Sequence, residues 1–260
     1  MRRGLTCLAC LALIVGVSTL AWAAGPAVAK PSPEQALGQL LAGNARFAAG
    51  QTQAPNRDQA RTALAATANQ GDHALATVLS CSDARVPVEL IFDVGIIDLF
   101  VIRVAGNVAQ TDEVGSIEYG VAHVHTPVLM VLGHSGCGAV SAVINEVEGR
   151  GVKWERNIPP LVAPIVPAVQ RAKAAHPDQC CAALLPAAVE ENVWQALFSV
   201  FKTSPATREL VRSGQVKAVG AVYDLASGQV RVLDPAKPAQ LLAQAEAAPD
   251  KAVEAYHQAR

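Results

Sequence analysis

This chain of 260 residues carries a net charge of −1, and aromatic residues make up only 4% of it. Without a basic stripe and with so few aromatic side chains, it does not have the composition of a nucleic-acid-binding protein. Residues 30–260 suffice for one sizeable α/β domain. We predict a single domain there, because nothing in the middle of the chain resembles an inter-domain linker.

The first 29 residues have the pattern of a secretory signal peptide. Arg2 and Arg3 precede an almost wholly apolar stretch over residues 5–24, and small residues at 21–23 and 27–29 fit two cleavage sites. We expect cleavage after residue 23 or 29 and export, in the simplest case to a periplasm. The alternative is an uncleaved membrane anchor, since the apolar run is only marginally long enough to span a bilayer.

Apolar periodicity predicts helices that alternate with strands along the rest of the chain. A helix that starts at Ser32 or Pro33 and ends near Ala49 forms an amino-terminal arm together with a second helix at about 57–69. Short apolar runs predict buried strands at 74–80, 99–103 and 127–133, and a terminal hairpin of strands at 217–224 and 229–233. The other predicted helices span about 87–92, 115–125, 137–149, 160–175, 184–203, 205–213 and the segment after 238.

This order favours a mostly parallel β-sheet flanked by helices, in which ligands bind beyond the carboxyl ends of the strands. Two polar motifs follow predicted strands. Cys-Ser-Asp-Ala-Arg at 81–85 comes directly after the strand at 74–80, and His-Ser-Gly-Cys-Gly at 134–138 comes directly after the strand at 127–133. We therefore expect both motifs to line one crevice at the same edge of the sheet.

The two motifs together contain a ligand set suited to zinc. Cys81, His134 and Cys137 supply two thiolates and an imidazole, and three ligands leave the open fourth position that is typical of a catalytic zinc ion. Asp83 can orient a water molecule at that position or close it as a fourth ligand. Arg85 can hold Asp83 in a bidentate ion pair and keep it off the metal. We predict one zinc ion per subunit.

With the segments 101–107 and 115–119, these motifs resemble the β-class carbonic anhydrases, and the likeness extends over most of residues 34–234. The resemblance implies zinc bound by the three residues named above and a doubly wound sheet. It also implies an obligate homodimer, or a higher oligomer, with its active sites at the subunit interface. The reaction it implies is the reversible hydration of carbon dioxide to bicarbonate and a proton by zinc-bound hydroxide.

Some residue roles follow from the resemblance alone. Phe100 and Tyr119 match aromatic positions that line the carbon dioxide pocket in plant-type members of the family. Gly138, next to a predicted zinc ligand, and Gln70, near the family's glutamine but at a different spacing, complete the expected substrate pocket. Backbone N–H groups at the start of the following helix are expected to stabilise the Cys137 thiolate.

Other positions depart from the family pattern. One subset of the family is inhibited by bicarbonate in a side pocket that uses a tryptophan three residues before the first zinc ligand. Here that position is Val78, although Arg103 matches the arginine of that pocket, so we expect little cooperative inhibition by bicarbonate. Cys180 and Cys181 belong to no predicted ligand set. They are either small, half-buried residues, partners in intermolecular bonds, or a vicinal disulfide.

Two other functions are compatible with the same residues. A carbon disulfide or carbonyl sulfide hydrolase on this scaffold would need the same zinc chemistry and differ in access to the metal. A non-catalytic zinc protein that binds bicarbonate would not need a guarded fourth position. The Asp83–Arg85 pair therefore favours an enzyme, and the family resemblance favours carbon dioxide as its substrate.

Overall fold

The computed structural model describes residues 30–151, 153–250 and 254, so the predicted signal peptide lies outside the described residues. The strands are β1 (Ala76–Ser80), β2 (Leu99–Arg103), β3 (Val128–His134), β4 (Lys217–Tyr223) and β5 (Val230–Val232). They form one sheet in the order β2-β1-β3-β4-β5, with the first four parallel and β5 antiparallel to β4. The predicted α/β class and the terminal hairpin are confirmed.

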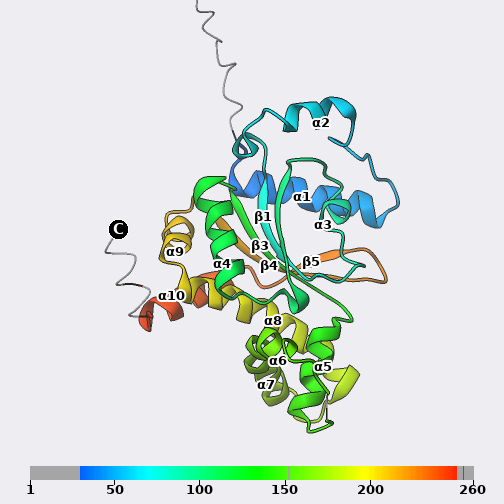
Figure 1. Ribbon diagram of the computed structural model, residues 1–260, viewed down its shortest axis with the longest axis vertical. Coiled ribbons are helices and arrows are strands. Elements are labelled where there is room, and N and C mark those ends of the chain that lie inside the picture. The colour runs from blue at the N-terminus through cyan, green and yellow to red at the C-terminus, as the bar shows by residue number, and fades with distance from the viewer. Residues whose placement is uncertain (1–29, 152, 251–253, 255–260) are drawn as a thin grey trace, which may run out of the picture.

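Helices fill the segments between the strands and cover both faces of the sheet (Figure 1). One face is covered by α1 and α3, and the other by α4, α8 and α10, while α5, α6 and α7 form a separate layer beyond α8. The helices are α1 (Pro33–Ala48), α2 (Gln59–Ala65), α3 (Val88–Ile91), α4 (Thr111–Glu118), α5 (Gly138–Val147), α6 (Ile158–Val162), α7 (Val166–Ala175), α8 (Cys181–Thr203), α9 (Pro205–Arg212) and α10 (Lys237–Ala247).

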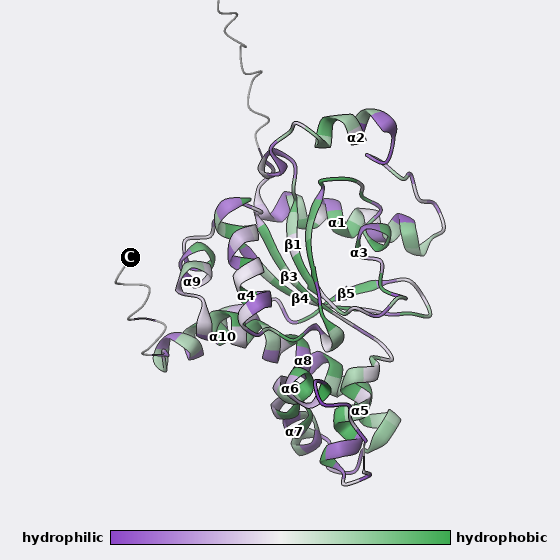
Figure 2. Ribbon diagram, in the orientation of Figure 1, coloured by the Kyte–Doolittle hydropathy of each residue, from purple (hydrophilic) through white to green (hydrophobic). Residues whose placement is uncertain are grey.

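The strands β1 and β3 form the buried centre of the sheet. Every residue of β1 and of β3 is buried, because helices lie on both faces, and such strands are typically continuous apolar runs. Figure 2 shows the hydrophobic residues concentrated along the strands. By contrast β2 is an edge strand, and its first four residues, all apolar, are only half-buried.

The amino-terminal helix packs on the chain's own sheet. A capping box starts it: the Ser32 hydroxyl accepts the Gln35 N–H, and the Gln35 side chain accepts the Ser32 N–H. Further along, the Asn44 amide donates to the carbonyls of Ile91 and Gly228. These bonds fix α1 to both α3 and the terminal hairpin.

Three predicted helices have different bounds in the structure. The helix predicted at 115–125 begins earlier, at Thr111, and ends in a π-helical turn over Tyr119–His123. The helix predicted at 160–175 is broken into α6, a 3₁₀ turn and α7, because prolines, Pro164 among them, interrupt helical hydrogen bonding. The second arm helix, α2, is shorter than predicted. None of the described helices is both long and apolar enough to cross a membrane.

Candidate metal centre and active site

Cys81, His134 and Cys137 meet at one edge of the sheet, as predicted. Cys81 directly follows β1 and His134 is the last residue of β3, so two adjacent parallel strands bring them to the same edge. Cys137 caps the amino end of α5. All three side chains are buried, and their ligand atoms lie within 4.8 Å of one another.

The two ring nitrogens of His134 are arranged as in a metal-binding histidine: one makes a hydrogen bond, and the other makes none with the described residues. Its Nδ1 donates a hydrogen bond to the Ser135 carbonyl at 3.0 Å, because a carbonyl oxygen can only accept. In the neutral ring, that bond selects the tautomer whose Nε2 lone pair is free to bind a metal ion. Nε2 is buried and has no hydrogen-bond partner within the described part of the chain. An orphaned buried polar atom costs about 1–3 kcal/mol, and a metal ion between it and the two sulphur atoms would satisfy it.

The two sulphur atoms differ in how easily they ionise. A hydrogen bond from the Cys137 thiol lowers the pKa of Cys81, and the same bond, with burial, raises the pKa of Cys137. Backbone N–H groups favour the ionised forms: that of Gly106 donates to Cys81 Sγ at 3.3 Å, and those of Ala139 and Val140, at the start of α5, contact Cys137. One thiolate therefore forms readily, and a bound cation would supply the charge that the second requires.

The peptide at Gly106 is held in place by α8. Gly106 has a φ of 76°, which disfavours residues other than glycine, and a Cβ there would lie 2.7 Å from Cδ1 of Ile165, which would have to move. The buried Asn192 amide donates to the Gly106 carbonyl at 2.7 Å, on the peptide that follows the one whose N–H contacts Cys81, and so helps to fix the position of Gly106. No sequence motif contains Asn192, and this contact is visible only in the folded chain.

Asp83 and Arg85 form the predicted two-point ion pair. Arg85 donates from Nε to Oδ1 of Asp83 at 2.9 Å and from its terminal nitrogen to Oδ2 at 2.7 Å. These bonds hold the pKa of Asp83 well below its usual range. Arg85 also donates to the Gly136 carbonyl at 3.3 Å and so joins the two motifs. Oδ2 of Asp83 lies 4.0 Å from Nε2 of His134, beside the ligand group.

Arg103 braces the loop that carries the first ligand. From the end of β2 its guanidinium donates to the Cys81 carbonyl at 3.0 Å and to the Asp83 carbonyl at 2.6 Å. Val78 is fully buried in the apolar core of β1. The arginine that matches the family's anion pocket is thus engaged by backbone carbonyls in this chain.

Three of the four predicted pocket residues lie away from the metal centre of the same chain. Phe100 pairs with Thr77 of β1, about 13 Å along the strand from Cys81. The ring of Tyr119, which is 51% exposed, lies 5.9 Å from that of Phe100. Gln70 begins the 3₁₀ turn Gln70–Asp72, before the amino end of β1. Gly138, the first residue of α5, is the predicted pocket residue that adjoins the ligands within one chain.

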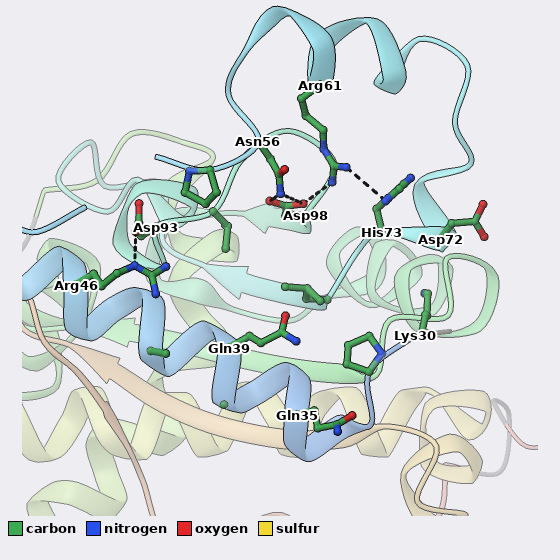
Figure 3. Close-up of a pocket in the computed structure, with 16 residues that line it drawn as sticks. Lys30, Gln35, Gln39, Arg46, Asn56, Arg61, Asp72, His73, Asp93 and Asp98 are labelled. Atoms are coloured by element: carbon green, nitrogen blue, oxygen red, sulfur yellow. Dashed lines mark hydrogen bonds and ion pairs between the residues drawn. The ribbon is translucent and has the colours of Figure 1, made fainter. Parts of the chain in front are cut away.

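A cavity of about 1060 Å³ lies beside α1, away from the metal centre (Figure 3). Ion pairs line it: Arg46 contacts Asp93 at 2.7 Å, and Arg61 contacts Asp98 at 2.5 Å. The Asn56 amide donates to the same Asp98 carboxylate. The carboxylates of Asp93 and Asp98 hold the loop before α2 against the sheet, so their burial and pairing serve the fold.

Comparisons with known proteins agree with the fold and the ligand group. Residues 76–230 match the family model described as carbonic anhydrase. Carbonic anhydrase 2 of Mycobacterium tuberculosis is 32% identical over 206 residues, which cover 78% of this chain and 94% of that protein. The β-carbonic anhydrase CafA of Aspergillus fumigatus superposes with a TM-score of 0.61 at 26% identity, over 81% of this chain and 97% of that chain. A structure from a study of two tetrameric β-carbonic anhydrases of Sordaria macrospora superposes with a TM-score of 0.56 at 21% identity. The superposition covers 66% of this chain and 85% of that chain.

The fold is a mostly parallel β-sheet between helices, with a buried Cys-His-Cys group at the carboxyl ends of its strands. These features are those of a metal-binding α/β protein. The chain belongs to the carbonic anhydrase family, in its β class. It is a lyase that interconverts carbon dioxide and bicarbonate, which confirms the predicted activity.

Proposed function

We propose that each subunit hydrates carbon dioxide with one zinc ion bound by Cys81, His134 and Cys137. The observation that carries the proposal is the orphaned Nε2 of His134, which is buried and unpartnered among the described residues, in a group whose ligand atoms lie within 4.8 Å of one another. Zinc, when bound there, supplies a Lewis acid and makes a nucleophile from water near neutral pH. The other steps fall to the side chains around it.

Asp83 orients the attacking water. Its depressed pKa keeps it ionised, and an ionised carboxylate only accepts hydrogen bonds. A water molecule beside it therefore turns a proton towards Asp83 and a lone pair away from it, towards the substrate. Arg85 engages both carboxylate oxygens and so keeps Asp83 out of the ligand group. Carbon dioxide is small and uncharged, so it needs no ionic partner in this pocket.

The variant Asp83→Asn tests this role directly. We expect it to retain zinc and to lose about 100-fold in hydration rate, the scale of a lost proton-orienting group. Stopped-flow hydration and metal analysis of the same sample measure both quantities. Asp112→Asn, on the exposed surface of α4, is the control and should leave the rate unchanged. Full activity in Asp83→Asn would refute the assignment, and assays with carbonyl sulfide and carbon disulfide would test the alternative substrates.

We further propose that the enzyme is a homodimer formed through β2. An apolar, half-exposed edge strand is an open site for pairing, and two copies related by a two-fold axis would pair these edges antiparallel. Antiparallel pairing places the amino end of one β2 beside the carboxyl end of the other. The metal centre adjoins the carboxyl end, because Arg103 there contacts Cys81. Phe100, at the amino end, would then approach the neighbouring copy's metal centre.

This arrangement accounts for the aromatic pair. Phe100 and Tyr119 are remote from the ligands of their own chain, and Tyr119 is exposed, so both are free to line the substrate pocket of a second copy. The superposed structure from Sordaria macrospora comes from a study of tetrameric enzymes, which also favours an oligomer. Gln70, at the same end of the sheet, is proposed for that shared pocket as well.

Mixing two inactive variants tests the shared site. Cys137→Ala removes a ligand, and the double variant Phe100→Ala/Tyr119→Ala removes the aromatic pair. If each site uses the partner's aromatics, a mixed dimer contains one complete site, and co-expression yields more activity than either variant alone. If each site is self-contained, co-expression restores nothing. Sedimentation of the native protein as a monomer would refute the dimer itself.

We also propose export, with cleavage after residue 23 or 29. The support is the basic start, the apolar stretch and the small residues of the first 29 positions. Mass spectrometry of protein recovered from the periplasm should show a chain that begins at residue 24 or 30. Intact Met1 in a membrane fraction would contradict this proposal.

A further inference from the structure

A second group of metal-ligand side chains lies apart from the proposed zinc centre. It consists of Glu148, just after α5, and Cys180 and Cys181, at the start of α8. Their ligand atoms lie within 4.8 Å of one another, and this is the second such group among the described residues. Neither cysteine takes part in a disulfide, and no part of the carbonic anhydrase reaction uses them.

The backbone brings the two neighbouring sulphur atoms together. Side chains of consecutive residues in an extended chain point to opposite sides. Here Cys181 has a φ of +55°, in the left-handed region that non-glycine residues disfavour, and the two Sγ atoms lie 3.0 Å apart. Cys180 is exposed and Cys181 is half-buried, so the pair is accessible from solvent.

Glu148 contributes a carboxylate oxygen without a hydrogen-bond donor. Its Oε2 pairs with Nε of Arg150 at 3.1 Å and lies 3.8 Å from Sγ of Cys181. Its Oε1 is buried and accepts no hydrogen bond from any described residue, although Nζ of Lys173 lies 3.9 Å away. A buried oxygen is costly to leave without a hydrogen bond, and a directly bound cation would satisfy it.

Two cationic side chains, Arg150 and Lys173, flank the group. Nε of Arg150 lies 3.1 Å from one oxygen of Glu148, and Nζ of Lys173 lies 3.9 Å from the other. These two cations offset part of the negative charge that two thiolates and a carboxylate would gather. Thiolates, rather than thiols, bind metals, and they select soft or borderline cations.

We propose that Glu148, Cys180 and Cys181 form a second site, for a thiophilic divalent cation of the zinc or cadmium type. Two sulphur atoms bound to one tetrahedral ion at about 2.3 Å lie about 3.8 Å apart, so the pair must open slightly from 3.0 Å. The exposed Cys180 has room for that movement. Binding releases the thiol protons to solvent, and solvent completes the fourth position. The ion would link the end of α5 to the start of α8.

Cadmium titration of the zinc-loaded enzyme, kept reduced by a phosphine, tests the proposal. We expect one cadmium ion per chain to bind in addition to the resident zinc, with thiolate charge-transfer absorption in the ultraviolet. The double variant Cys180→Ser/Cys181→Ser should lose that absorption while its zinc content and hydration rate stay unchanged. Glu148→Gln should weaken cadmium binding about tenfold or more, since even outer-shell changes cost 10- to 100-fold.

Glu146→Gln provides the matched control. Glu146 lies on α5 two residues from Glu148, but its carboxylate accepts from Trp154 instead, so cadmium affinity should not change. Equal cadmium binding in the native enzyme and the double serine variant would overturn the proposal. So would a Cys180–Cys181 disulfide, seen as a loss of two hydrogens in the mass of freshly isolated protein. This test is independent of the proposed zinc site. Cadmium binding by Cys180 and Cys181 can still be measured in Cys137→Ala, whether or not that variant loses zinc.

Discussion

Arg85 holds Asp83 by two parallel hydrogen bonds, 2.9 and 2.7 Å long, and its backbone N–H adds a third to the same carboxylate. The pair is partly exposed, yet its geometry is that of a fork matched to a carboxylate. Oδ2 of Asp83 is only 4.0 Å from Nε2 of His134, and we propose that the Arg85 guanidinium keeps this carboxylate from becoming a fourth metal ligand.

Removing that restraint should close the site. In Arg85→Ala we expect zinc content to stay at one ion per chain, while the hydration rate falls at least tenfold because Asp83 takes the open position. A crystal structure of the variant would show the coordination. The double variant Arg85→Ala/Asp83→Ala is the control, since it has no carboxylate to coordinate. Asp83 still turned away from zinc in Arg85→Ala would contradict the role assigned to the arginine.

Asn192 should act on the metal through Gly106. Asn192→Leu removes the donor that holds the Gly106 carbonyl. Gly106 can then shift, so its N–H contact to Cys81 loosens and zinc affinity should fall about 10- to 100-fold. Competition with a chelator measures that affinity. Asn145→Leu, on α5, is the comparison, because its side chain makes no hydrogen bond found among the described residues. Unchanged zinc affinity in Asn192→Leu would exclude this positioning role.

Asp93 should link stability to acid pH. Burial alone would raise the pKa of Asp93, but the N–H groups of Gln53 and Ala54 and the Arg46 guanidinium outweigh burial and lower it. A lowered folded-state pKa stabilises the protein fully above the ordinary value of about 3.9, and this contribution is lost as pH falls through the folded-state value. Asp93→Asn should therefore lower the free energy of unfolding by about 3 kcal/mol at neutral pH.

Denaturant unfolding of both proteins at several pH values would measure this difference. It should shrink as the medium is acidified below about pH 4, since the native carboxylate is then protonated too. Asp112→Asn, an exposed site, should track the native protein throughout. A difference that stays constant from neutral to acid pH would show that Asp93 contributes only packing.

Bicarbonate should inhibit weakly and without cooperativity. Val78 is fully buried where the regulated subset has an indole, and the Arg103 guanidinium is occupied by the carbonyls of Cys81 and Asp83. Rates of hydration at increasing bicarbonate, at constant pH and ionic strength, should fall along a simple hyperbola. A sigmoidal loss of activity would mean that an anion displaces Arg103 from the loop.

The sequence predicted the metal centre because its ligands are local to strand ends. Cys81 and His134 lie at the ends of apolar runs that predict parallel strands, and parallel strands end at one edge of the sheet; the structure adds that these two strands are neighbours. The outer contacts could not be predicted in this way. Asn192 lies far along the chain in a long helix, and only the packing of α8 against the sheet brings it to Gly106.

The pocket residues mark a different limit. Phe100 and Tyr119 were assigned by resemblance to the substrate pocket, yet in one chain they lie at the other end of β2 from the metal centre. Strand periodicity does not say which copy of the chain a side chain serves. The early start of α4 at Thr111 follows from a capping box between Gln110 and Glu113. That signal was present in the sequence but weaker than the apolar pattern.

Zinc restoration tests the central claim most directly. The native enzyme is stripped with a chelator, zinc is returned in steps, and bound zinc and carbon dioxide hydration are measured on each sample. The proposed site predicts that hydration rises in proportion to zinc and saturates at one ion per chain, with Cys137→Ala regaining neither high-affinity zinc nor activity. Full hydration activity in the stripped protein, or zinc bound as tightly by Cys137→Ala as by the native chain, would contradict it.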